Sequence, residues 1–298
     1  MLETPVEADV SLVRSGANAQ FTRWKSELLS TGIRMRGAKN VLRFERLDPM
    51  PAMTWVQAEG TTREPMAVKS ARQDPHKVFV VFGPDHAPIT VDVVNGALDE
   101  TVAATRTGNS PAMLVFCAFQ FDPEAARIID EWKTETHGFV VLKVQMNADL
   151  LTEDLKTRRS SNESFWMIGQ PEIELKKVGD GWQIRVKGFD YYDTTTGKID
   201  SGGPDQIAMW MLDTNFNGRS MWPKQIFFPL AGNDDGWAKV AKTLRAELEE
   251  DRVEALSGTV SLPFSEGKYK RIAVKIIDRR GIESVRVLAL TTKGSSKP

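Results

Sequence analysis

The chain has 298 residues, 41% of them hydrophobic, so it is long enough to bury a core in about two domains. Its 39 basic residues almost balance its 40 acidic ones, and the net charge of −1 excludes a general electrostatic attraction to DNA or to anionic membranes. The only cysteine, Cys117, lies in an apolar run, which excludes a disulfide framework and a cysteine zinc site and predicts a buried, inert thiol. Residues 1–11 lack the order of a signal peptide, and no run approaches the roughly 18 apolar residues of a membrane span, so we expect a soluble, cytoplasmic protein with no membrane partner.

Residues 1–75 are predicted to form an N-terminal helix, short strands and a basic loop. Apolar residues recur at helical spacing within residues 18–30, and Gly32 is placed to end that helix. We expect short strands over residues 40–44 and 53–58, and an exposed loop or linker over residues 60–75.

Residues 76–157 alternate continuous apolar runs with segments of helical periodicity, which predicts a βαβαβ, Rossmann-like unit with a buried parallel sheet. Asp122, Pro123 and Glu124 predict a helix start, because Asp caps, Pro is tolerated at the first helical position and Glu favours the helix N-terminus. The predicted strands are residues 77–82, 112–119 and 139–144, the predicted helices are residues 91–104 and 122–132, and a short helix follows over residues 148–156.

Residues 158–290 are predicted to form a strand-rich domain with a mostly antiparallel sheet. The sequence Gly-Asp-Gly at residues 179–181 is a strong hairpin signal, and an apolar stripe over residues 234–250 predicts one helix packed on the sheet. The polar tail, residues 291–298, is expected to be disordered. The predicted strands are residues 165–168, 172–178, 182–186, 207–212, 225–228, 259–262, 271–277 and 284–290. The predicted fold class is therefore α/β plus mainly β.

Six stretches of the sequence together resemble one protein family. The densest is SSNESFWMIGQP at residues 160–171. The others are FQFDPEAA at 119–126, DLLTEDL at 149–155, GFDYYD at 188–193, MWMLD at 209–213 and RIAVKIID at 271–278. These stretches resemble the C-terminal region of large site-specific DNA adenine-methyltransferases from type III-like restriction-modification systems, and the resemblance covers roughly the last two thirds of the chain.

In that family, methyl transfer needs an Asp/Asn-Pro-Pro-Tyr/Phe tetrad that holds the flipped base and a Gly-rich turn for S-adenosylmethionine. Asp48, Asp74 and Asp122 each precede a proline, but none is followed by Pro-Tyr or Pro-Phe, and the turn that begins at Gly83 lacks the second glycine. The resemblance therefore implies a non-catalytic end of such an enzyme, as a fragment, a split gene product or a stand-alone descendant. It implies no catalytic residue and no cofactor in this chain, since S-adenosylmethionine would enter only with the missing catalytic domain.

The candidate DNA-binding residues form two basic patches. The first patch lies within residues 14–46, and the second is the pair Arg158 and Arg159. In the first patch, loop side chains can reach phosphates, and Trp24 or Phe44 can stack on a base. The alternative interpretation of the first patch is a solvated helix face with charged flanks. Aromatic residues around Trp166 and Tyr191 are a further candidate for base stacking. The predicted DNA-binding residues are Arg23, Lys25, Arg34, Arg36, Lys39, Arg43, Arg158 and Arg159.

Three weaker motifs each have a plainer alternative. Glu174 and Lys176 form a Glu-x-Lys pattern, which nucleases use around Mg²⁺ but which any exposed strand can carry. The sequence DTNFNG at residues 213–218 matches half of a calcium loop, yet Lys224 stands where the bidentate Glu belongs, which favours an Asx-rich turn. His86 follows a predicted parallel strand, where α/β proteins place ligand sites, and a turn histidine is the alternative.

The predicted function is that of an accessory region of a restriction-modification DNA methyltransferase in phage defence, which supports DNA engagement or subunit assembly. Its expected partners are DNA, a catalytic methyltransferase segment, or a restriction or translocase subunit. The alternatives are a Mg-dependent nuclease-like domain and a purely structural protein-interaction module. The DNA hypothesis predicts that neutralising Arg34, Arg36 and Arg43 together weakens binding and flattens its salt dependence.

Overall fold

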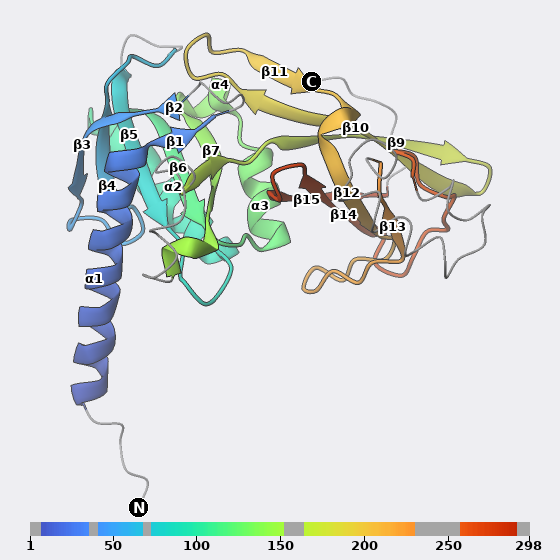
Figure 1. Cartoon of the computed structure of the whole chain (residues 1–298), viewed down its shortest axis with the longest axis horizontal. Coiled ribbons are helices and arrows are strands. Elements are labelled where there is room, and N and C mark those ends of the chain that lie inside the picture. Colours follow the sequence, from blue (N-terminus) through green and yellow to red (C-terminus); the bar gives the residue numbers. More distant parts are fainter. Residues whose placement is uncertain (1–6, 36–40, 68–72, 152–163, 230–256, 291–298) are drawn as a thin grey trace, which may run out of the picture.

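The computed structural model describes residues 7–35, 41–67, 73–151, 164–229 and 257–290, with the side chains of the first helix from residue 19 onward. These residues form a mixed α/β protein with one large sheet, two smaller antiparallel sheets and few helices (Figure 1). The predicted α/β plus β class is therefore confirmed at this level. The helix expected over residues 234–250 and the tail expected after residue 290 lie outside the described residues.

The helices cover one large sheet on both faces. The helices are α1 (Glu7–Thr31), α2 (Val91–Arg106), α3 (Pro123–Asp130) and α4 (Thr134–His137), with short 3-10 helices at η1 (Ala148–Leu151) and η3 (Pro204–Gln206). Helix α1 begins earlier than predicted and ends beside Gly32, whose φ of +72° suits the left-handed turn that glycine adopts without strain. Asp122 caps α3 as predicted, because its carboxylate accepts from the backbone N–H groups of Glu124 and Ala125.

The large sheet has eight strands in the order β2-β1-β8-β7-β6-β5-β4-β3. Strands β5, β6 and β7 run parallel to one another, with α2 connecting the first pair and α3 the second. The strands are β1 (Ile33–Arg34), β2 (Val41–Leu42), β3 (Phe44–Pro49), β4 (Ala58–Thr62), β5 (Asp74–Phe82), β6 (Pro111–Ala118), β7 (Val140–Met146) and β8 (Phe165–Met167).

The two edges of this sheet are joined through a single residue. Strand β2 ends at Leu42 and β3 begins at Phe44, although the two strands stand at opposite ends of the strand order. Two consecutive Cα–Cα steps span at most about 7.6 Å, so the sheet must curl until its edges almost meet. Arg43, the connecting residue, is exposed.

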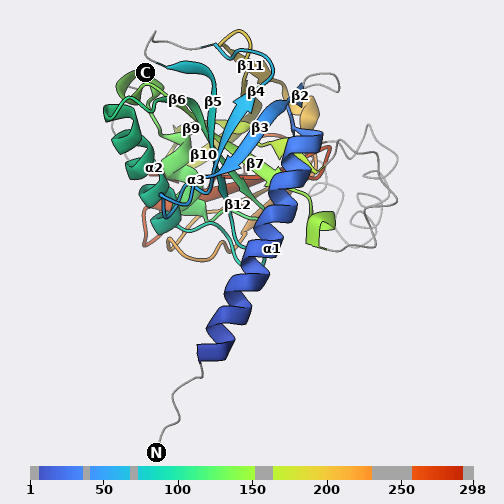
Figure 2. The ribbon, with the colours of Figure 1, turned by 90° about the vertical axis from the view of Figure 1, so that its left-hand side faces the viewer.

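Apolar side chains fill both faces of the sheet. Helices α2 and α3 pack on one face, with Val94 and Ile129 against alternate residues of β5 and β6. Helix α1 packs on the opposite face through Trp24 and Leu28, as Figure 2 shows by the positions of α1 and α2. The burial of β6 on both faces follows from its continuous apolar run, and it places Cys117 fully out of solvent, as predicted.

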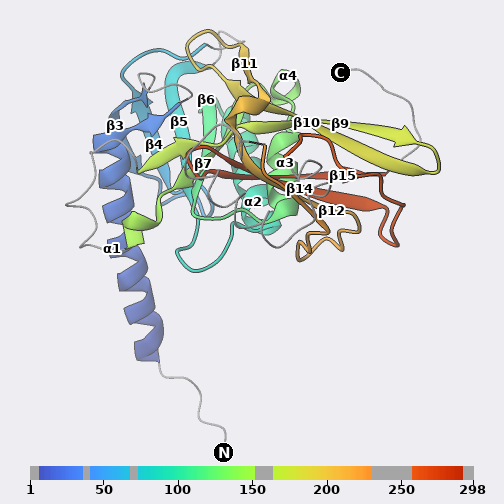
Figure 3. The same ribbon diagram turned by 45° about the vertical axis from the view of Figure 1, so that its right-hand side comes forward.

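The C-terminal half forms two antiparallel sheets (Figure 3), and their buried apolar residues join the core cluster that also contains Trp24 and Leu28 of α1. One sheet has the order β11-β10-β9 and contains the predicted hairpin, in which Val178 pairs with Gly181. The other has the order β13-β12-β14-β15 and is tied to α3 by an Arg271–Glu124 ion pair of 2.8 Å. The strands are β9 (Gln170–Val178), β10 (Gly181–Tyr192), β11 (Ile199–Gly202), β12 (Ile207–Asp213), β13 (Gln225–Phe227), β14 (Arg271–Asp278) and β15 (Glu283–Ala289).

Two local predictions were wrong, and a third was wrong only at its two ends. Residues 53–57 form no strand, because the backbone N–H groups of residues 54–56 donate to the carboxylate of Glu100 on α2. The expected loop over residues 60–75 contains parts of β4 and β5, where the absence of a side chain at Gly60 admits the ring of Phe44. Residues 259–262 form only an isolated bridge, Val260 with Arg185 of β10.

Candidate nucleic-acid interface

A crevice of about 580 Å³ lies beyond the carboxyl ends of β6 and β7. Gln120 follows β6, Asn147 follows β7, and both line the crevice. Its remaining walls are Trp166 of β8 and the turn that joins β14 to β15. Because parallel strands end at the same edge of a sheet, their following residues converge there, and ligands of open α/β sheets bind outside such an edge.

The strand pattern decides which way Trp166 faces. Its neighbours Phe165 and Met167 are buried in the core on the α1 face. Since successive side chains of a strand point to opposite faces, the half-buried Trp166 lies on the α3 face of the sheet. There it is flanked by Gln145 of β7 and Arg34 of β1, its partners in the strand register.

Two guanidinium groups lie against the indole ring. The Cζ atom of Arg34 is 5.0 Å from the ring centroid of Trp166, and the Cζ atom of Arg280 is also 5.0 Å from it. A cation at this distance is attracted by the ring quadrupole, by about 0.5–1 kcal/mol at an exposed site. Sequence reasoning had placed Arg34 and Trp166 in separate candidate groups, and the structure brings them together.

Arg280 was missed from the sequence, although it is the best anchored cation of the crevice. Its Nε and Nη2 atoms lie 2.7 Å and 2.6 Å from Oδ2 of Asp278, and Nη2 donates to the Tyr191 hydroxyl at 3.2 Å. The buried Asp278 carboxylate also accepts from the backbone N–H groups of Arg280 and Ile282, which fixes the turn. In the sequence, only the position of Arg280 between the strands predicted at residues 271–277 and 284–290 could have indicated its role.

A smaller hollow of about 280 Å³ adjoins the crevice and holds His86, the residue predicted to follow a parallel strand. The two hollows share Phe119, Gln120 and Gln145 on their walls. Nδ1 of the exposed His86 lies 2.5 Å from Oδ1 of Asp85. This contact, followed by a hydrogen bond from Gln20, holds the pKa of Asp85 below its usual value, so its carboxylate stays charged in this hollow.

Of the other predicted DNA-binding residues, the three that the structure describes do not line the crevice. The half-buried Arg23 donates to the carbonyl oxygen of Leu150 and so ties α1 to η1. Lys25 is half-buried on α1, and Arg43 is exposed between β2 and β3. Arg36, Lys39, Arg158 and Arg159 lie outside the described residues.

The proposed stacking roles of Trp24 and Phe44 were wrong. Trp24 is 4% exposed and packs edge-on against Phe119, while Phe44 is 1% exposed. Of the wider aromatic group, Tyr191 and Trp210 are also buried. Trp24 belongs to the apolar stripe that helical spacing predicts for this segment, and its burial there leaves no exposed ring surface on which a base could stack.

Residues of two weaker motifs form ion pairs or hydrogen bonds with neighbouring groups of the chain. Glu174 and Lys176 share one face of β9 and form an ion pair of 3.1 Å, and the hydrogen bond from Lys176 lowers the pKa of Glu174. Asp213 accepts from the backbone N–H groups of Asn215 and Trp222, the pattern of an Asx turn. Within the described part of the chain, no group of three or more His, Cys, Asp or Glu side chains is arranged to hold a metal ion.

None of the helices that the structure describes is both long and apolar enough to cross a membrane.

Comparisons with protein-family models, with curated proteins and with solved structures gave no match. The crevice is therefore interpreted from its own geometry.

Proposed function

We propose that this chain engages DNA as an accessory, non-catalytic part of a restriction-modification methyltransferase, through the crevice around Trp166. The observation that carries the proposal is the contact of Arg34 and Arg280 with the ring of Trp166, which lines the crevice together with Arg280. Arginine guanidinium groups are the side chains most suited to contact phosphate oxygens, and aromatic rings are the side chains on which bases stack.

Two further points support the proposal. If β5, α2, β6, α3 and β7 are taken as a Rossmann-like unit, the crevice lies where such units bind ligands, outside the carboxyl ends of the strands. The resemblance to the C-terminal region of type III-like DNA adenine-methyltransferases is dense at residues 160–171, which include Trp166. Catalysis then belongs to a partner segment that carries the base-holding tetrad and binds S-adenosylmethionine.

The proposal is tested by fluorescence anisotropy with a short labelled DNA, as duplex and as single strand, at low salt. Arg34→Ala and Trp166→Leu are expected to weaken binding by about three- to tenfold each, which corresponds to roughly 0.7–1.4 kcal/mol. Trp166→Phe keeps an aromatic ring and should restore most of the affinity. Arg185→Ala, at an exposed position of β10, is the matched control and should bind as the unmodified chain does. Equal affinity of all variants would show that the crevice does not contact DNA.

A further inference from the structure

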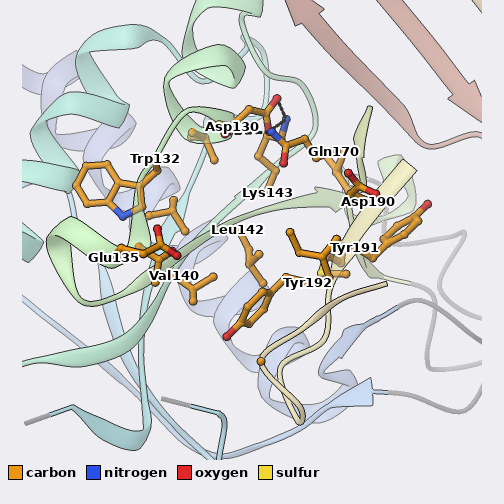
Figure 4. A pocket seen from close by; sticks show the side chains of 17 residues that line it. Asp130, Trp132, Glu135, Val140, Leu142, Lys143, Gln170, Asp190, Tyr191 and Tyr192 are labelled. Atoms are coloured by element: carbon orange, nitrogen blue, oxygen red, sulfur yellow. Dashed lines mark hydrogen bonds and ion pairs between the residues drawn. The ribbon is translucent and has the colours of Figure 1, made fainter. Parts of the chain in front are cut away.

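A second hollow, of about 310 Å³, lies between the edges of two strands from different sheets (Figure 4). Strand β7 of the large sheet forms one side and the last residues of β10 form the other. The hollow is separate from the Trp166 crevice, since the two share no lining residue among those described.

Among the described residues, no strand pairs with the first half of β7 on the side away from β6. Residues Val140–Lys143 pair with β6 on one side, whereas β8 pairs only with Val144, Gln145 and Met146 on the other. The carbonyl oxygen of Lys143 accepts from the N–H of Ile168, which shows that the main-chain groups of Lys143 point away from β6. Main-chain direction alternates along a parallel strand, so the N–H and C=O of Val141 also point away from β6, into the hollow.

Strand β10 presents a second open edge across the hollow. Its pairing with β9 ends at Asp190, while Tyr191 and Tyr192 continue to pair with β11. The N–H of Asp193 donates to Lys198 on the β11 side, so by the same alternation the main-chain groups of Tyr192 point to the opposite side, towards the hollow. Two strand edges with outward main-chain groups thus face one space, and an extended backbone is a partner that can pair with such an edge.

The charged side chains around the hollow favour a cation. Three carboxylates, from Asp130, Glu135 and Asp190, line it against one ammonium group, that of Lys143. Lys143 is already neutralised by Asp130, to which it lies 2.7 Å away with both side chains buried. Asp190 of β10, whose Oδ1 accepts from the Ser201 hydroxyl, contributes a carboxylate to the opposite wall, and this charge attracts a positive side chain.

Aromatic walls complete the hollow. Trp132 and Tyr192 lie on its two sides in Figure 4, and Trp132 is held by stacking on His137 at 4.0 Å. Burial, with a smaller effect from Asp193, raises the pKa of Tyr192, so its phenol stays protonated. The aliphatic stem of a lysine or arginine packs well against such rings, with its charged end directed to a carboxylate.

We propose that this groove binds an extended segment of a partner protein, which pairs as an added strand with the Val141 edge of β7 and places a lysine or arginine side chain near Asp190. The part of β7 before Lys143 that lacks a described partner on this side is residues 140–142, which at about 3.3 Å per residue suits a short segment of about three residues. Main-chain hydrogen bonds supply affinity and the basic side chain supplies selectivity. The proposal does not depend on DNA binding, and either can fail without the other.

The test is selection of short random peptides on the full-length chain, followed by amide hydrogen exchange. We expect the selected peptides to alternate apolar residues with lysine or arginine, and the best synthetic peptide to slow exchange at Val141 and Tyr192, which exchange rapidly in the free chain. The same peptide with alternate backbone amides methylated should lose binding, because it cannot pair with the strand edge.

Asp190→Asn should weaken the unmethylated peptide by about fivefold, the upper range for one exposed ion pair. Glu45→Gln, at an exposed position on β3, is the control and should not change it. The proposal is overturned if no peptide is selected, if the Val141 amide is already protected in the free chain by another segment, or if backbone methylation and Asp190→Asn leave binding unchanged.

Discussion

Lys143 and Asp130 form an ion pair in which Nζ lies 2.7 Å from Oδ1 and 2.8 Å from Oδ2, with the two side chains only 4% and 8% exposed. Lys143 reaches from β7 to Asp130 at the end of α3, and it lines both the hollow of about 310 Å³ between β7 and β10 and a neighbouring hollow beside β15. The main chain of Asp130 is held as well, because its carbonyl oxygen accepts from Gln170 Nε2 at 3.0 Å. The pair therefore fastens α3, β7 and the start of β9 together.

Removing one partner of this pair should destabilise the fold strongly. Asp130→Ala leaves the Lys143 ammonium buried without its carboxylate, which should lower the free energy of unfolding by about 3–5 kcal/mol. The double variant Asp130→Leu with Lys143→Met replaces both charges by apolar groups and should recover most of that loss. Urea denaturation of the three proteins measures the difference, and an equal loss in the single and double variants would contradict the account.

Glu100 is expected to hold residues 54–56 in their non-strand conformation. Its carboxylate accepts from three backbone N–H groups at 2.7–2.9 Å, so Glu100→Ala leaves them without this acceptor. The expected loss is about 1–3 kcal/mol in the free energy of unfolding. Asp99→Ala, at the adjacent exposed position, is the control and should change stability by less than about 0.5 kcal/mol. If Glu100→Ala lowered the free energy of unfolding by no more than the control does, Glu100 would not be what holds residues 54–56 in place.

Gly96 should resist a substitution that normally stabilises helices. An alanine in a helix interior is usually favoured over glycine by about 1 kcal/mol. A Cβ atom at Gly96, however, would lie 2.3 Å from Nε1 of Trp55, so Gly96→Ala is expected to destabilise by about 1–3 kcal/mol. In a Trp55→Ala background the same change should cost less, because the clash is gone. Thermal or urea unfolding of the unmodified chain, the two single variants and the double variant gives the cost of Gly96→Ala in both backgrounds. Additive effects of the two substitutions would contradict the clash.

Cys117 is expected to be unreactive in the folded chain. Burial raises the pKa of its thiol well above the ordinary value, so the folded state disfavours the thiolate. The corresponding stability is fully present below the unfolded thiol pKa of about 8.5 and is lost as the pH rises above it. A thiol reagent at mildly alkaline pH should label the chain only in urea, and Cys117→Ala should flatten the alkaline fall in stability. Rapid labelling without urea would contradict the burial.

Local apolar patterns predicted most of the elements that the structure contains. The continuous run that contains Cys117 predicted β6, and Asp122 with Pro123 predicted the start of α3, because each signal lies within the element that it specifies. Residues 53–57 were assigned wrongly because their hydrogen-bond acceptor, Glu100, lies more than forty residues away along the chain. No local pattern records such a contact.

The candidate site could be predicted only in part. Arg34, Trp166 and His86 were singled out from the sequence, but their arrangement depends on the pairing of β1 with β8 and on the β14–β15 turn that carries Arg280. The buried charge of Lys143 was also missed, since a lysine between Leu142 and Val144 in a strand ordinarily lies at the surface, and only the fold brings Asp130 against it. Both omissions are contacts between segments distant in sequence.

The central claim, that the crevice around Trp166 engages DNA, is tested most directly by the salt dependence of DNA affinity. Each phosphate contact contributes a slope of about −0.9 in log affinity against log salt concentration on duplex DNA. The account predicts that Arg34→Ala weakens binding and reduces the size of this slope by about one unit relative to the unmodified chain, whereas Arg185→Ala leaves both unchanged. Identical slopes and affinities in all three proteins, or no DNA binding at low salt, would contradict it.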